Sequence, residues 1–226
     1  MCVVKVELHE LCGPRICPWR RPLRALIANA CREKSTPMSM CCWRAPSWDS
    51  AKTSWLSVSR VAVRLHSATF PHFGNFPETE TFAPREFPER LASALQDLAI
   101  GFWADDPEVR ASLHQFTEVA REMPTPNHMS LIMPDLAPSQ LLTNDGRITA
   151  LIDTESYVRG PAELELAVVE LWTENPEAFR AGYLEVNDIF PRIGDCREAY
   201  RYFIYLLYNA PPKGLSKWLE APEYFD

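Results

Sequence analysis

The sequence predicts an α+β fold that is mostly α-helical, with a short central β-hairpin and an incomplete N-terminal part. Two apolar runs, at 141–143 and 148–152, flank Asn144-Asp145-Gly146, which is a strong signal for a hairpin turn. On both sides of this hairpin, apolar residues recur every three or four positions, as amphipathic helices require. Residues 1–60 show no sustained period, so the regular fold is expected to occupy residues 61–226.

Apolar spacing and start signals predict five helices beyond residue 88. Asp106-Pro107 and Asn175-Pro176 each place a capping side chain before a proline, which is typical of a helix start. The residues expected to face the core are Leu91, Leu95 and Leu98; Val109, Leu113, Phe116 and Ala120; Leu164, Val168 and Leu171; Phe179, Tyr183 and Val186; and Tyr200, Phe203, Ile204 and Leu207. Residues 70–88, with four prolines and five aromatic residues, are predicted to form a packed loop.

Charge and hydropathy exclude several classes of function. A net charge of −7 and a pI near 5.3 argue against a nucleic-acid-binding protein. No apolar run approaches the ~20 residues that a membrane-spanning helix needs. The first residues are charged and lack the apolar centre of a secretory signal. A cytoplasmic protein is therefore expected, with no membrane and no nucleic acid among its partners.

The N-terminal quarter differs in composition from the rest of the chain. Residues 1–65 hold eleven Lys or Arg against four acids, and six of the seven cysteines lie in the first 55 positions. The cysteine spacings do not repeat a metal-ligand pair, which disfavours a zinc module. Because this stretch also lacks a hydrophobic period, we regard residues 11–59 as a remnant or a segment read in the wrong frame.

Two acids and an amide gather at one end of the predicted hairpin. Asp135 lies in a proline-punctuated loop before the first strand, Gln140 lies at its start, and Asp153 follows the second strand. A loop carboxylate that acts as a base, beside carboxylate and amide oxygens that bind Mg²⁺, is the arrangement used for phosphoryl transfer in kinase-like folds.

The motifs here resemble the catalytic segment of the aminoglycoside phosphotransferase family, which is related to choline kinases and to protein kinases. That family reads H-G-D-x-x-P-x-N, two strands, I-D-x-E and G-D-P-A-x-D-L-A. This chain has MPDLAPSQ at 133–140, IDTE at 152–155 and GPAELELA at 160–167, in the same register without a gap. The resemblance covers roughly residues 60–226 and implies a protein-kinase-like C-lobe.

The resemblance also implies the roles of individual residues. Asp135 would be the catalytic base, Asp153 and Gln140 would bind Mg²⁺, and Lys5 would contact the phosphates of ATP or GTP. The implied acceptor is a hydroxyl group of a small molecule. For Lys5 the alternative is an ordinary surface lysine. For the whole chain the alternative is a catalytically inactive, truncated kinase-like binding protein or a non-functional gene product.

Three positions depart from the family pattern. Met133 replaces a histidine that braces the catalytic loop, Gln140 replaces an asparagine, and Glu165 replaces a structural aspartate. The segment at 161–167 is expected to form a helix that supports the loop from behind. His66 ends a predicted helix, where packing beside the core is favoured over a role as catalytic base. Gly13 is the only glycine before Gly74, so a glycine-rich turn over the phosphates is not recognisable.

Overall fold

The computed structural model describes residues 55–75, 81–134, 136, 138–144, 147–152, 157–191, 193–207 and 214–225. Within these ranges the architecture is α+β and mostly helical, as the sequence predicts. The α-helices are α2 (Trp55–His66), α3 (Phe87–Phe102), α4 (Pro107–Glu122), α5 (Ala162–Trp172), α6 (Pro176–Leu184), α7 (Arg197–Leu207) and α8 (Leu215–Leu219). Short 3₁₀ turns are η2 (Pro84–Glu86), η3 (Pro138–Gln140) and η5 (Gly194–Cys196).

Two small antiparallel sheets accompany these helices. The hairpin expected from the sequence is β4 (Leu141–Asn144) and β5 (Arg147–Leu151), with a register shift between Leu142 and Thr143. The second sheet has four strands in the order β1-β3-β6-β2, and its strands are β1 (Thr69–Phe70), β2 (Gly74–Asn75), β3 (Met129–Ile132) and β6 (Val158–Gly160). The prediction of a loop over residues 70–88 was therefore wrong in part, because β2 and η2 lie within it. Strands β1 and β2 have two residues each, which is too short to show the alternating pattern of a strand.

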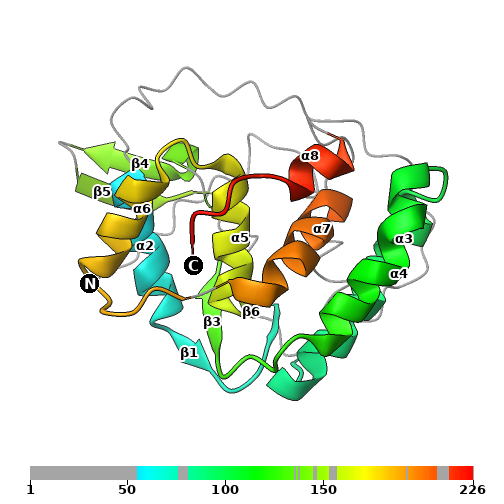
Figure 1. Cartoon of the computed structure of the whole chain (residues 1–226). Coiled ribbons are helices and arrows are strands. Elements are labelled where there is room, and N and C mark those ends of the chain that lie inside the picture. Colours follow the sequence, from blue (N-terminus) through cyan, green and yellow to red (C-terminus); the bar gives the residue numbers. More distant parts are fainter. Residues whose placement is uncertain are drawn as a thin grey trace, which may run out of the picture.

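The helices form pairs around this sheet (Figure 1). Helices α3 and α4 pack along each other on one side, and α7 contacts both of them. Helix α5 lies at the centre, against α7 and β3. Helices α2 and α6 pack together on the opposite side. None of the helices in the described ranges is long and apolar enough to cross a membrane.

The helix starts follow the signals in the sequence. The side chain of Asp106 accepts a hydrogen bond from Val109 N at 3.0 Å, and Asn175 caps α6 through Ala178 N at 3.0 Å. The predicted inward faces are buried or half-buried with one exception. Val186 is 51% exposed, because α6 ends at Leu184 and Val186 lies beyond its last turn.

Helix α2 begins at Trp55 and therefore crosses the boundary that the sequence places between residues 60 and 61. Its residues Val58, Ala62 and Val63 are fully buried in the core. Ala62 and Val63 follow Val58 by four and five residues, so the helical period extends back to Val58. The stretch expected to be irregular up to residue 59 is therefore helical from Trp55. Residues 1–54 lie outside the described ranges.

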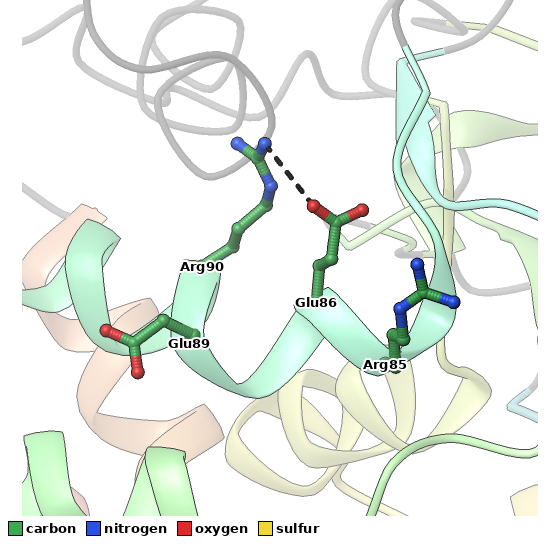
Figure 2. Close-up of a pocket in the computed structure, with 4 residues that line it drawn as sticks. All are labelled: Arg85, Glu86, Glu89 and Arg90. Carbon is green, nitrogen blue, oxygen red and sulfur yellow. Dashed lines mark ion pairs between the residues drawn. The ribbon is translucent and has the colours of Figure 1, made fainter.

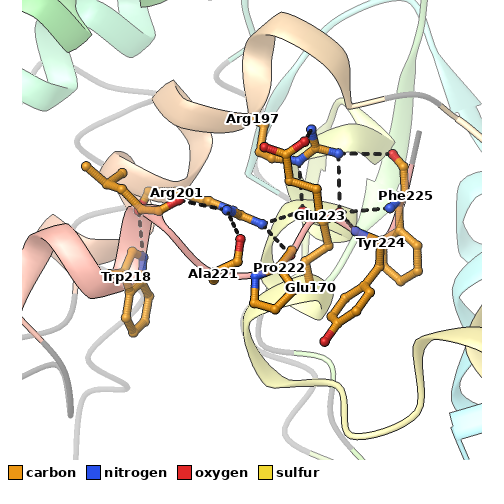
Figure 3. Close-up of polar contacts among 10 residues, drawn as sticks. Glu170, Arg197, Arg201, Trp218, Ala221, Pro222, Glu223, Tyr224 and Phe225 are labelled. Atoms are coloured by element: carbon orange, nitrogen blue, oxygen red, sulfur yellow. Dashed lines mark hydrogen bonds and ion pairs between the residues drawn. The ribbon is translucent and has the colours of Figure 1, made fainter.

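The C-terminal segment is held by a buried cluster of charges around Glu170 (Figure 3). Glu170, which is 2% exposed, pairs with Arg197 Nε at 3.1 Å and with Arg201 Nη2 at 3.0 Å. Its other oxygen accepts hydrogen bonds from Tyr224 N and Phe225 N at 2.8 and 2.9 Å. Arg201 donates to the carbonyl oxygens of Leu219, Ala221 and Pro222. The last described residues are therefore an integral part of the fold.

Candidate functional site

The β4–β5 hairpin fixes Gln140 beside the end of β5. Gln140 ends η3 directly before β4, and its carbonyl oxygen accepts a hydrogen bond from Ile152 N at 2.9 Å. Ile152 is the residue before Asp153. The backbone therefore joins Gln140 to the chain position next to Asp153, as the hairpin predicts. The Gln140 side chain is 2% exposed, so its amide is shielded from bulk water.

The chain on either side of Asp135 is buried and hydrogen-bonded. Met133 is fully buried, and Leu136 is 2% exposed. Leu136 N donates to Met133 O at 2.8 Å. Met133 N donates to the carboxylate of Glu165, which comes from the first turn of α5. The loop is thus braced through the main chain of Met133, where the resembled family uses a histidine side chain.

Glu165 connects this loop to the end of α2. Its side chain is fully buried, and its second oxygen lies 3.1 Å from His66 Nε2. No arginine or lysine pairs with Glu165 among the contacts of the described residues. Its position in the first turn of α5 places the carboxylate near the partial positive charge of a helix N-terminus. Glu165 therefore fulfils the supporting role expected from the segment at 161–167, with a longer side chain than aspartate.

His66 is a buried connecting residue at the end of α2, as the sequence favoured. His66 is 6% exposed, its ring Nδ1 lies 2.8 Å from the Tyr183 hydroxyl, and its backbone carbonyl oxygen accepts from Ser130 Oγ at 2.9 Å. Helices α2, α5 and α6 and strand β3 therefore meet behind the loop of Asp135. We call the side chains of Tyr183, His66 and Glu165, together with Met133 N, the loop network. The sequence indicated that Tyr183 is buried but gave no sign of its polar partner.

Burial raises the pKa of the Tyr183 hydroxyl, and the negative charges of Glu165 and Glu163 raise it further. The hydroxyl is therefore protonated at neutral pH. Burial likewise raises the pKa of the Cys196 thiol to about 11, with smaller contributions from the charges of Glu163 and Asp195. Cys196 is thus a neutral thiol rather than an activated nucleophile.

The other predicted site residues, Lys5, Asp135 and Asp153, lie outside the described ranges. The structure joins Gln140 to Ile152, the neighbour of Asp153, and the roles of Lys5, Asp135 and Asp153 stay predictions. Among the described residues, no group of three or more His, Cys, Asp or Glu side chains could hold a metal ion.

Comparisons with known proteins give one similar structure. No protein-family model and no curated protein matches the chain. The crystal structure of a thermostable mutant of aminoglycoside phosphotransferase APH(4)-Ia, in its apo form, is similar with a TM-score of 0.47 and 23% sequence identity. The match covers 71% of this chain and 57% of that one, so the chain spans little more than half of the matched protein.

A shallow surface pocket lies elsewhere, at the start of α3 (Figure 2). It is lined by Arg85, Glu86, Glu89 and Arg90. Three of these side chains have partners within the protein: Arg90 lies 4.0 Å from Glu86 and stacks on Phe82 at 3.3 Å, and Glu89 pairs with Arg121 at 3.2 Å. Their charges are largely offset by one another, and none of the predicted site residues lines this pocket. We interpret it as part of the solvated surface.

Proposed function

We propose that the chain is a phosphotransferase of the aminoglycoside phosphotransferase type, which transfers the γ-phosphate of ATP or GTP to a hydroxyl group of a small molecule. In this proposal Asp135 is the base that orients the acceptor hydroxyl and accepts its proton. Lys5 contacts the nucleotide phosphates, and Asp153 and Gln140 hold Mg²⁺. Little covalent chemistry is required of the protein, so its main contribution is to position these groups.

The observation that carries the proposal is the bracing of the chain around Asp135. A base that orients an acceptor must be held to within a fraction of an ångström, because small displacements cost much of the rate. Met133 and Leu136 are both buried, and Met133 N is bonded to a buried carboxylate. Such a carboxylate is costly to bury without an arginine, and support of a catalytic loop gives it a purpose. The ungapped register of the three motifs at 133–167 supports the same reading.

The proposed ligands fit Mg²⁺ by their chemistry. Asp153 offers a carboxylate oxygen and Gln140 an amide oxygen, and Mg²⁺ prefers oxygen ligands of these kinds. The hydrogen bond between Gln140 O and Ile152 N supports the pairing of these two positions. When bound, the ion would neutralise the charge of the β- and γ-phosphates.

The alternative is a catalytically inactive, truncated kinase-like binding protein or a non-functional gene product. The sequence observation in its favour is the single glycine, Gly13, before Gly74, since a phosphate-covering turn usually needs several. A phosphotransferase must bind a nucleotide, whereas neither alternative is expected to bind one. A binding protein and a non-functional product differ in whether the chain melts cooperatively.

The experiment is a titration of the full chain with ATP and with GTP, with and without Mg²⁺, followed by transfer of labelled phosphate to a panel of small hydroxyl compounds. We expect Mg²⁺-dependent binding of a nucleotide and transfer to at least one compound. Asp153→Asn should remove the Mg²⁺ dependence, whereas Asp188→Asn, a surface change outside the proposed site, should not. A chain that melts cooperatively but binds neither nucleotide would contradict the proposal and favour the binding protein.

A further inference from the structure

The C-terminal segment is held mainly through its main chain. We call residues 219–225 the strap. Arg201, which is 1% exposed on α7, binds three carbonyl oxygens of the strap at 2.7–2.9 Å, those of Leu219, Ala221 and Pro222 (Figure 3). A guanidinium carries several N–H donors in a fixed fork, so one arginine can serve several carbonyl oxygens along a peptide.

The second half of the strap offers N–H groups to a carboxylate. Glu170 on α5 accepts from Tyr224 N and Phe225 N at 2.8 and 2.9 Å, and Arg197 donates to Phe225 O at 3.4 Å. A carboxylate can only accept and a guanidinium can only donate. The N–H groups of residues 224 and 225 must therefore face Glu170 while the carbonyl oxygens before them face Arg201. This arrangement fixes the direction and the register of the strap.

One side chain of the strap serves as its anchor. Phe225 is fully buried, and its ring centroid lies 5.4 Å from that of Phe179 on α6 and 5.0 Å from that of Phe190. The side chain of Glu223 is 61% exposed and makes one ion pair, and Tyr224 is 38% exposed. Recognition of the strap therefore rests on its main chain and on one aromatic ring.

The side chains that hold the strap form what we call the strap site: Glu170, Arg197, Arg201, Phe179 and Phe190. We propose that the strap site is a peptide-binding site, which the C-terminal segment of the chain fills and which a separate peptide of the same sequence can fill in its place. Main-chain hydrogen bonds supply the affinity, and burial of the aromatic ring supplies the selectivity. None of these contacts requires a covalent link between the strap and α8. The inference does not depend on phosphate transfer.

The first test separates main-chain from side-chain recognition in the full chain. Tyr224→Pro removes the N–H group from which Glu170 accepts, whereas Tyr224→Ala keeps this group and removes the ring. Loss of a hydrogen bond to a charged group should lower the Tm of Tyr224→Pro by about 3–10 °C, and the decrease for Tyr224→Ala should be clearly smaller. Equal decreases in the two variants would overturn the inference.

The second test supplies the strap as a separate peptide. Phe225→Ala in the full chain removes the anchor and weakens the tethered strap. A fluorescently labelled peptide with the sequence of residues 219–226, LEAPEYFD, is titrated against this variant and against the wild-type chain. The intact strap of the wild-type chain competes at an effective concentration of millimolar order, so the peptide should bind Phe225→Ala at least about tenfold more tightly. Bound peptide should also raise the Tm of the variant.

Controls establish that binding occurs at the strap site. Peptides that carry Tyr224→Pro or Phe225→Ala should bind about tenfold more weakly or less, since each lacks a main contact. Tyr202→Phe in the chain removes a hydroxyl that donates to Val109 O on α4, away from the strap, and should bind the peptide no better than the wild-type chain does.

The outcome is decided whether or not Phe225→Ala folds alone. If this variant lacks a cooperative melting transition, the unmodified peptide should restore one and the Phe225→Ala peptide should not. Equal affinity of the peptide for the variant and the wild-type chain would overturn the inference, as would a variant that neither binds the peptide nor is rescued by it.

Discussion

Helix α5 buries two glutamates, Glu165 and Glu170, whose surroundings differ in the charge that offsets them. Glu170 pairs with Arg197 and Arg201 and accepts from two backbone N–H groups of the C-terminal segment. Glu165 pairs with no arginine of the described residues; it accepts from one backbone N–H group and faces a histidine. Arginine is always charged, whereas histidine can change both its charge and its tautomer near neutral pH.

This difference separates a cluster that holds the fold from a network that supports a site. Every oxygen of Glu170 is bonded to a permanent cation or to the backbone, and Arg201 in turn secures three carbonyl oxygens before the C-terminus. The members of the loop network come from helices α2, α5 and α6 and from the chain next to Asp135. An adjustable partner such as His66 suits a carboxylate whose task is to hold a loop in place. The following predictions test this contrast.

The largest effect is expected for Glu170→Gln. The change removes the negative charge between Arg197 and Arg201 and leaves both cations buried with less compensation. Breaking a buried ion pair on one side typically costs about 3–5 kcal/mol. Unfolding in denaturant should therefore show a loss of this size in the free energy of unfolding. The control is Glu174→Gln on the exposed turn after α5, and a similar small change for both variants would contradict the assignment.

A smaller loss of stability is expected for Gly182→Ala, which disturbs the packing of α6 on α2 beside the loop network. A Cβ atom at Gly182 would lie 2.3 Å from Ser59 Oγ and 2.7 Å from Leu56 O, so α6 must move away from α2. Overpacking of this kind costs about 1–3 kcal/mol. Gly101→Ala is the matched control, since no atom lies within 4 Å of a Cβ there and the helix gains from alanine. Thermal melting should show a lower Tm for Gly182→Ala than for the wild-type chain, and no decrease for Gly101→Ala.

A still smaller loss is expected for Glu165→Gln, although Glu165 is buried as deeply as Glu170. The glutamine oxygen can accept from Met133 N, and its amide takes the place of the carboxylate oxygen that faces Nε2 of His66. Because no permanent cation remains unpaired, the cost should be that of one altered hydrogen bond, about 1–2 kcal/mol. Denaturant unfolding of both glutamine variants under one set of conditions gives the comparison. A greater loss for Glu165→Gln than for Glu170→Gln would reverse the contrast.

The smallest effect concerns alkaline pH, because the loop network ends on a tyrosine. The pKa of Tyr183 is raised above 10.0 in the folded chain by burial and by the charges of Glu165 and Glu163. Above pH 10 the unfolded chain loses this proton while the folded chain keeps it, so the free energy of unfolding falls as pH rises. The contribution is fully present below that pH and is lost above it, by at most about 1.4 kcal/mol per pH unit.

Denaturant unfolding at several alkaline pH values measures this contribution. The stability difference between the wild-type chain and Tyr183→Phe should shrink above pH 10, the ordinary pKa of tyrosine. The exposed Tyr224 serves as control, and Tyr224→Phe should follow the wild-type curve. Parallel curves for the wild-type chain and Tyr183→Phe would show that the hydroxyl of Tyr183 contributes nothing of this kind.

Local patterns made the helices and the hairpin predictable from the sequence. The turn-forming sequence Asn-Asp-Gly at 144–146 and the capping residues Asp106 and Asn175 act on their near neighbours, so their effect is visible in the sequence itself. The four-stranded sheet was missed because strands such as β1 and β2 are only two residues long. The long-range polar contacts were also missed, because the pairing of Glu170 with Arg197, or of His66 with Tyr183, leaves no periodic trace in the chain.

The candidate site was predictable only in part. The motif register identified Gln140 and Glu165, and the structure places both beside the chain that carries the predicted acids. The sequence treated Met133 as the loss of a bracing side chain. The structure shows instead that the main chain of Met133 makes the bracing hydrogen bond, a contact that any residue other than proline could supply.

The most direct test of the account is phosphate transfer by Asp135→Asn. The substitution keeps the size of the side chain and removes the base, so turnover should fall by about 10²–10⁴-fold, while the melting temperature stays close to that of the wild-type chain. Asp105→Asn changes an exposed acid outside the site and should leave turnover unaltered. Turnover in Asp135→Asn equal to that of the wild-type chain would contradict the role of Asp135, and with it the proposed purpose of the loop network.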